Sequence, residues 1–184
     1  MRSLFCLVAA LLFSQLAIAV DNPRVRIDTT LGSFTLELYQ EAAPITVANF
    51  LRYVDEGFYD NTLFHRIIKR FVVQGGGFGP NMAKKVTHPP IINESHNRLY
   101  NDRFTVAMAR NDDPDSATSQ FYINLRMNSS LDFRMGKIGY TVFGEVIEGK
   151  EVVHDMSYVE THHFAGMDDV PVEPVILIKA ERLH

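Results

Sequence analysis

Tryptophan is absent from this chain of 184 residues, and cysteine occurs once, as Cys6. Cys6 lies in a first segment that we expect to be removed, so the remaining chain has no disulfide and its stability must come from packing and backbone hydrogen bonds. A basic excess is also lacking, because 18 Lys and Arg stand against 22 Asp and Glu, for a net charge of −4. This balance argues against nucleic acid or an anionic membrane surface as a partner.

A long hydrophobic run is missing after the first segment, which itself is typical of a secretory signal peptide. Arg2 and the amino terminus supply positive charge, Leu4 to Phe13 is apolar, and the small residues Ala17 to Ala19 fit a cleavage site. A membrane-spanning helix needs about 18 or more apolar residues, and Ser14 and Gln15 interrupt this run. We therefore expect a signal peptide at 1–19 and a protein exported to the bacterial periplasm, or to a secretory lumen, with no membrane attachment after cleavage.

Residues 20–184 are expected to form one globular domain, since 46% of the chain is hydrophobic and 22% is charged. Alternation from Val25 to Leu38 predicts a β-hairpin whose turn uses Gly32 at positive φ. Apolar residues at helical spacing between Pro44 and Gly57 predict a helix with one apolar face, to be laid against a sheet.

The rest of the chain is predicted to form mostly strands and loops. Strands are predicted for "TLFHRII", "FVVQGG", "FTVAMAR", "SQFYINL", "YTVFGEVI" and "EPVILIKAERL", and a second short helix for "GKEVVHDMSYV". Many short strands with only two helices indicate a mainly β protein that closes into an antiparallel barrel, which removes exposed edges.

The stretch "FHRIIKRFVVQGGGF", residues 64–78, carries two polar groups that a plain core strand would not need. Arg66 and Gln74 stand among large apolar residues, and burying an unpartnered charge is costly. The stretch therefore predicts the wall of a site. The glycines at 75–77 lack the GxxxxGK[ST] order of a phosphate loop, and a sharp exit from the strand explains them better.

Three motifs, "FHRIIKRFVVQGGGF", "SQFYINL" and "YTVFGEVIEG", together resemble the cyclophilin-type peptidyl-prolyl cis-trans isomerases, and "TVANFLRYVDEGFYDNTLFHR" is similar as well. The resemblance runs from about Val25 to Leu183, and the "DSATSQF" loop is most similar to the exported bacterial branch. It implies a closed eight-stranded antiparallel β-barrel capped by two α-helices, with a prolyl-peptide groove on its outer face.

The resemblance also assigns roles to residues. Arg66 and Gln74 match the family's pocket arginine and glutamine, and we expect them to be catalytic. The expected substrate-binding residues are Phe71, Val72, Ala109, Arg110, Tyr122, Leu131 and Tyr140. Val72 stands where many members have methionine, Tyr122 where phenylalanine is common and Tyr140 where many eukaryotic members have histidine. The loop after Ala109 is longer than the form common in the family, so its alignment is loose. Arg110 and Asn111 are expected to line the groove through backbone contacts.

Proline isomerisation sets a simple physical requirement. Rotation about an X–Pro bond breaks amide resonance, with a barrier of about 18–20 kcal/mol, and no bond to carbon is made or broken. A catalyst needs no nucleophile, metal or cofactor, but must bind the twisted amide more tightly than either planar form. Arg66 suits that state, because its permanently charged guanidinium can donate to the localised lone pair of the prolyl nitrogen. Gln74 can orient Arg66 or the substrate carbonyl.

The sequence leaves one alternative function open and disfavours two others. The open alternative is a non-catalytic chaperone or adaptor whose groove only holds proline segments. A metal-dependent hydrolase is disfavoured, because the histidines, including the adjacent His162 and His163, follow no strong ligand spacing and suit a solvated loop. A serine hydrolase is disfavoured as well, since no histidine is visibly paired with the serines of "DDPDSATSQ".

The expected partners are proline-containing unfolded or partly folded polypeptides, bound by a monomer that assists the folding of exported proteins. Ser130 stands where many eukaryotic members have a tryptophan whose ring favours cyclosporin. We therefore expect cyclosporin to bind weakly.

Overall fold

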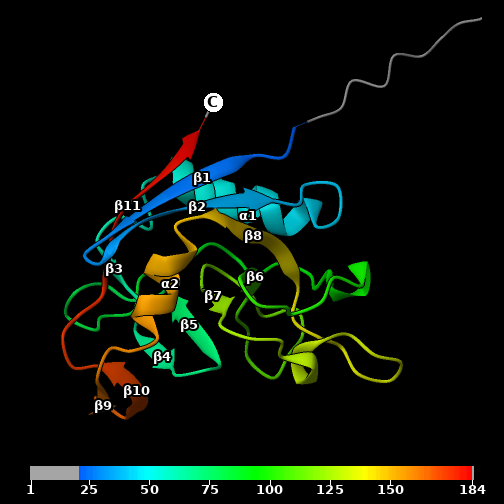
Figure 1. Ribbon diagram of the computed structural model, residues 1–184. Helices are drawn as coiled ribbons and strands as arrows, with labels where there is room; N and C mark the ends of the chain where they lie inside the picture. The colour runs from blue at the N-terminus through cyan, green and yellow to red at the C-terminus, as the bar shows by residue number, and fades with distance from the viewer. Residues whose placement is uncertain (1–20, 184) are drawn as a thin grey trace, which may run out of the picture.

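The computed structural model describes residues 21–183. The predicted signal peptide at 1–19 lies outside this range. Within it the elements fall into one curled sheet, one small hairpin, two α-helices and two 3₁₀ turns (Figure 1). The strands are β1 (Arg24–Thr29), β2 (Gly32–Leu38), β3 (Thr62–Leu63), β4 (Arg66–Ile68), β5 (Val72–Gly75), β6 (Thr105–Met108), β7 (Phe121–Asn124), β8 (Val142–Glu148), β9 (Thr161–Phe164), β10 (Met167–Pro171) and β11 (Ile176–Leu183).

The main sheet has nine strands in the order β3-β11-β1-β2-β8-β6-β7-β5-β4, and the neighbouring pairs are antiparallel. One more strand is counted than the eight expected, because the single strand predicted for "TLFHRII" is interrupted at Phe64 and His65. Its two halves, β3 and β4, lie at the two ends of the strand order. They share no hydrogen-bonded ladder in the described part of the chain, so closure of the expected barrel is not confirmed.

The sheet encloses one large apolar core on its inner side. Phe50, from helix α1 (Pro44–Asp55), contacts the rings of Tyr59, Phe121 and Phe143 at centroid distances of 5.1, 5.4 and 5.2 Å. All four side chains are fully buried. The amphipathic helix predicted from Pro44 onwards therefore lies against the sheet through its apolar face.

Helix α2 (Lys150–Met156) lies against the start of β2 (Figure 1). Gly32 has φ +127° at the predicted turn, and a Cβ there would approach Val152 Cγ2 to 2.9 Å. The turn thus needs glycine both for its backbone conformation and for the close packing of the helix. The expected hairpin, both helices and their apolar faces are confirmed.

The hairpin of β9 and β10 was not predicted, and it corrects one expectation. His162 and His163 lie on a strand and not in a solvated loop, although both side chains are exposed. The 3₁₀ turns η1 (Ser95–Asn97) and η2 (Ser129–Leu131) lie in connections between strands.

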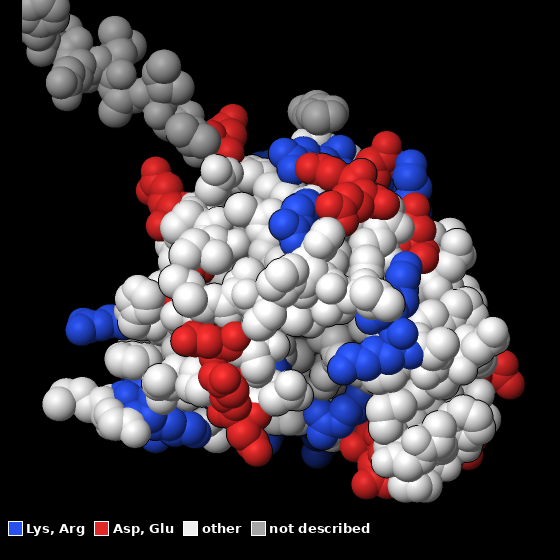
Figure 2. All heavy atoms as spheres, turned by 180° about the vertical axis from the view of Figure 1, so that it is seen from behind, with Lys and Arg blue, Asp and Glu red and all other residues white. Residues whose placement is uncertain are grey.

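On the face seen in Figure 2, acidic and basic side chains are interspersed and form no continuous basic surface. Between residues 21 and 183 no helix has the length and apolar character to span a membrane.

Candidate active site

A row of side chains crosses four strands on the outer face of the sheet. Arg66 on β4 is in register with Gln74 on β5, Gln74 with Tyr122 on β7, and Tyr122 with Ala107 on β6. Successive side chains of a strand point to opposite faces, so the neighbours of these residues, such as Val73 and Ile123, enter the inner core. Strand alternation therefore places a charged group, an amide and an aromatic ring side by side.

Two neutral amides hold Arg66 at the edge of this row. The half-buried guanidinium donates from Nη1 to Gln74 Oε1 at 3.3 Å, and Gln74 Nε2 donates to Gln120 Oε1 at 2.9 Å. None of the ion pairs formed within residues 21–183 involves Arg66. Its charge is thus oriented without being neutralised by a carboxylate, and its other N–H groups can serve a bound molecule.

A second apolar cluster lies beside Arg66 on the same face, and we call it the outer slot. Its buried floor is Val72, Ala107, Tyr122 and Val142. Partly buried residues packed against this floor are Tyr39, Phe71, Leu99, Ala109, Leu131 and Tyr140. The structure therefore brings six of the predicted binding residues into one cluster.

Arg110 is expected to line the groove through backbone contacts, and the structure shows a role for its side chain as well. Its guanidinium lies 4.4 Å from the centre of the Tyr140 ring and donates to the carbonyls of Asn111 and Ile138 at 2.8 and 3.2 Å. The Tyr140 ring in turn meets Tyr122 edge-on at 5.9 Å. Arg110 thus supports the wall of the outer slot through Tyr140.

A hollow of about 120 Å³ adjoins the outer slot, shares Ala109 with it, and is also lined by Gln74. The other lining residues are Lys84, Arg110, Asn111, Ser116, Thr118 and Gln120. Two basic side chains and no acidic one line this hollow. An extended peptide held in the outer slot could place a neighbouring polar side chain there.

The glycines after β5 make room for this arrangement. Gly76 has φ +81°, and a Cβ on Gly77 would come within 2.5 Å of Gln120 Cγ. The run therefore turns the chain sharply out of the strand, as predicted, and leaves space for the amide that holds Gln74.

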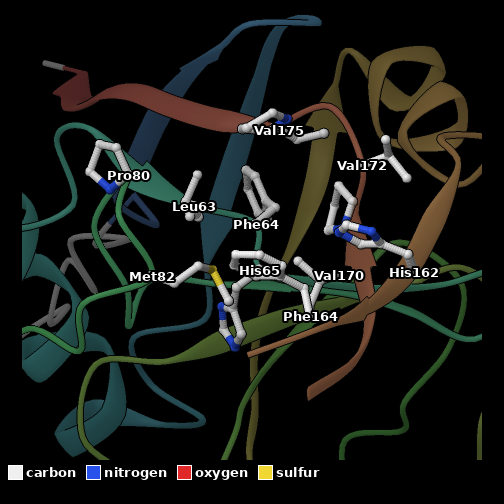
Figure 3. Close-up of a pocket in the computed structure, with 12 residues that line it drawn as sticks. Leu63, Phe64, His65, Pro80, Met82, His162, Phe164, Val170, Val172 and Val175 are labelled. Carbon is white, nitrogen blue, oxygen red and sulfur yellow. The ribbon is translucent and has the colours of Figure 1, made fainter. Parts of the chain in front are cut away.

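A separate apolar cavity of about 210 Å³ lies between the β9–β10 hairpin and residues 63–65 (Figure 3). Figure 3 shows Pro80 and Met82 on one side of it and His162 and Val172 on the other. Arg66, Phe71, Gln74 and Tyr122 do not line it. This cavity is therefore distinct from the row of side chains described above, although it shares the segment that precedes Arg66.

His65 lies at this cavity, is 3% exposed, and has no hydrogen-bond partner for Nδ1. Burial lowers the pKa of His65 to about 4 from 6.5, because a charged imidazole would be poorly solvated there. In the unfolded chain the ring takes up its proton at higher pH than in the folded protein. The stabilising effect of the neutral ring is therefore complete above pH 6.5 and is lost as the pH falls towards 4.

We expect His65 to make the wild type lose about 3 kcal/mol of unfolding free energy between pH 7 and pH 4. In His65→Gln the acid-dependent loss should be smaller by that amount, because the other titrating groups are common to both proteins. Urea unfolding of both proteins at several pH values measures the difference. Equal losses in the two proteins would show that His65 does not titrate in this way.

The structure also reveals contributors that sequence reasoning left unassigned. Gln120 lies within the quoted "SQF" motif, whereas Asn101, Asn128 and Asp132 underlie the outer slot without belonging to any quoted motif. No group of three or more His, Cys, Asp and Glu side chains could hold a metal ion in the described range 21–183.

Comparisons with known proteins agree with this geometry. Residues 24–182 match the family model described as cyclophilin type peptidyl-prolyl cis-trans isomerase/CLD. Peptidyl-prolyl cis-trans isomerase A of Dickeya dadantii is 43% identical, over 92% of this chain and 89% of its own. Peptidyl-prolyl cis-trans isomerase cyp18 of Streptomyces antibioticus is 49% identical, over 86% of this chain and 98% of its own.

A solved structure supports the likeness in three dimensions. The cyclophilin type peptidyl-prolyl cis-trans isomerase of Cryptosporidium parvum, determined in the presence of the dipeptide Ala-Pro, matches with a TM-score of 0.76 at 27% identity. The match covers 88% of this chain and 99% of that one.

Proposed function

This chain belongs to the cyclophilin-type peptidyl-prolyl cis-trans isomerases, enzymes that act on proline-containing peptides, and from that premise we propose which of its residues turn the X–Pro bond. Arg66 donates a hydrogen bond to the prolyl nitrogen of the twisted amide, Gln74 orients Arg66, and the outer slot binds the proline ring. The observation that carries this assignment is the register Arg66–Gln74–Tyr122 beside the outer apolar cluster.

The proposed reaction follows from the electronic structure of the amide. When the X–Pro bond twists, resonance is lost and the prolyl nitrogen recovers a localised lone pair. An N–H group of Arg66 that points at this lone pair stabilises the twisted state more than either planar state, which is the condition for catalysis. The apolar floor beside Arg66 excludes water and so strengthens the contact.

Positioning by neutral amides suits this role. Gln74 and Gln120 fix the direction of the guanidinium through hydrogen bonds of 3.3 and 2.9 Å without cancelling its charge. A carboxylate in the place of Gln74 would compete with the lone pair for the same donors. The chain of two amides therefore supports a preorganised donor.

A non-catalytic holder of proline segments would use the same outer slot, and one experiment separates the two functions. Magnetisation exchange in NMR spectra of the peptide Ala-Ala-Pro-Phe reports its cis/trans interconversion. We expect exchange signals at substoichiometric protein, because the uncatalysed reaction takes tens of seconds or longer. Saturable binding with unchanged exchange would identify a holder.

We further propose that the substrates are exported proteins in the bacterial periplasm, where isomerisation assists their folding. The support is the charge and apolar pattern of residues 1–19. Expression of the full chain in a Gram-negative host should give a periplasmic protein whose intact mass corresponds to a first residue of Val20. Retention of residues 1–19 on a cytoplasmic protein would refute this proposal.

Weak cyclosporin binding and a monomeric state complete the proposal. Ser130, which stands where a tryptophan would favour the drug, is exposed and offers no aromatic surface. Titration with cyclosporin should therefore give a much larger Kd than for a relative with tryptophan there. Sedimentation should give the mass of one chain.

A further inference from the structure

We propose that a buried polar network, formed by Asn101, Asn124, Asn128 and Asp132, positions the floor and walls of the outer slot, and that the Tyr122 hydroxyl is its link to the floor. The inference rests on the proposed function of that slot. None of the four residues belongs to the slot itself, so they are positioning residues. The network joins three parts of the slot that come from different segments of the chain.

The floor is attached through Tyr122. Its hydroxyl donates to Asn101 Oδ1 at 2.8 Å, and Asn124 Nδ2 donates to the same oxygen at 3.2 Å. Burial raises the pKa of Tyr122 well above its usual value, so the phenol stays protonated and remains a donor. A phenylalanine in place of Tyr122 could not donate this hydrogen bond to Asn101.

One wall, Leu131, is attached through the residue that follows it. Asp132 Oδ1 accepts from the Asn101 backbone N–H at 2.7 Å and from Asn101 Nδ2 at 3.0 Å. Leu131 N–H donates to the Asn128 carbonyl at 2.8 Å, and Asn128 N–H donates to the Asn101 carbonyl at 2.8 Å. Asn101 thereby ties the turn that carries Leu131 to the hydroxyl of Tyr122.

A second wall residue, Phe71, is attached through Asn128. The amide Nδ2 of Asn128 donates both to the Phe71 carbonyl at 3.0 Å and to Asn124 Oδ1 at 2.7 Å. Phe71, Tyr122 and Leu131 are therefore joined by a single set of hydrogen bonds, although Phe71 lies far from the other two in the sequence.

Burial makes this network sensitive to change. Asn101 and Asn124 are fully buried, and Asn128 and Asp132 are 3% and 6% exposed. A buried polar network with its partners satisfied favours one arrangement, whereas loss of a member leaves donors or acceptors without water. The separation between the slot walls should therefore be fixed by these residues.

The expected kinetic signature is a change in KM. The slot contacts the proline ring in the planar and twisted states alike. A less well-defined slot should therefore weaken the binding of both states equally and leave kcat nearly unchanged. For Tyr122→Phe, which removes one buried hydrogen bond, we expect KM to rise roughly three- to tenfold. Asp132→Ala should raise KM further, and Asp132→Asn, which keeps an accepting oxygen, should restore most of the loss.

A matched control is Tyr53→Phe. The hydroxyl of Tyr53, a buried residue of helix α1, accepts a hydrogen bond of 2.9 Å from the backbone N–H of His88, and phenylalanine would remove this acceptor. Both Tyr→Phe proteins should lose thermal stability, but only Tyr122→Phe should bind Ala-Ala-Pro-Phe more weakly. The test measures Tm, KM and kcat, together with the Kd of the same peptide by titration.

A rise in KM and Kd for Tyr122→Phe alone supports the network. Unchanged KM and Kd in Tyr122→Phe, with the stability of both variants lowered, would show a merely structural role and overturn the inference. Should Asp132→Ala fail to fold, Tyr122→Phe still decides. A wild type that binds the peptide without accelerating exchange would refute the proposed function, while the Kd values would still test the network.

Discussion

Replacing Arg66 by alanine is expected to lower kcat/KM for a short X–Pro peptide by about 10²–10³ with the fold retained. The change removes the donor that we propose for the twisted amide. It also removes one hydrogen bond to Gln74, of 3.3 Å, at a half-buried position. Such a bond is worth about 1 kcal/mol, so the folded state should persist. A protease-free cis/trans assay measures the rate, and circular dichroism checks the fold.

Two companion variants make this result specific. Arg66→Lys keeps the positive charge but loses the planar fork, so an intermediate loss of about tenfold is expected. Arg52→Ala removes an exposed arginine on α1, paired with Glu56 at 3.9 Å, and should leave the rate unchanged. If Arg66→Ala isomerises the peptide at a near-normal rate, the role assigned to Arg66 is wrong.

Replacing Glu94 by alanine is expected to lower the unfolding free energy by about 3–5 kcal/mol. The N-cap residue of α1, Ala43, has no side chain that could accept a hydrogen bond. Glu94, which is 5% exposed, supplies the acceptor from a distant part of the chain. Its carboxylate accepts from Ile45 N–H at 3.1 Å, from Thr46 N–H at 2.8 Å and from the Thr46 hydroxyl at 2.7 Å.

The size of this effect follows from what alanine would leave behind. Three donors near the start of α1 would lose their partner, and the favourable interaction of the carboxylate with the helix dipole would vanish. Urea unfolding compares Glu94→Ala with Glu56→Ala, an exposed glutamate at the other end of the same helix. Glu56→Ala should cost less than about 1 kcal/mol. Equal losses in the two variants would contradict the capping role of Glu94.

Local patterns predicted the elements well because the physical causes are local. Alternation from Val25 to Leu38 predicts the hairpin of β1 and β2, and the apolar residues at helical spacing after Pro44 predict helix α1. Alternation also explains why Arg66 and Gln74 share a face while Val73 enters the core.

Non-local contacts could not be predicted in the same way. The interruption at Phe64 and His65 divides the expected strand in two, and the two halves pair with different strands, β11 and β5, which local sequence does not reveal. The strand that carries His162 and His163 has exposed side chains and no apolar alternation, so no pattern indicated it. Strand pairing there comes from β10.

Within the site, the residues that carry a recognisable motif were found and those that support them were not. Arg66 and Gln74 stand out as polar groups in an apolar run. Asn101 and Asp132, by contrast, are ordinary loop residues in the sequence, and only the fold brings the Asp132 carboxylate to the Asn101 amide. Their importance depends on burial, which composition does not reveal.

The proposed role of Arg66 is to act on the twisted amide and not on the bound peptide in its planar forms. Its most direct test is to measure, for Ala-Ala-Pro-Phe on wild type and Arg66→Ala, both the Kd and the exchange rate of the bound peptide. We expect Kd values that agree within about threefold and an exchange rate lowered by about 100-fold or more in Arg66→Ala. An unchanged exchange rate on Arg66→Ala, or a loss that is entirely one of Kd, would contradict it.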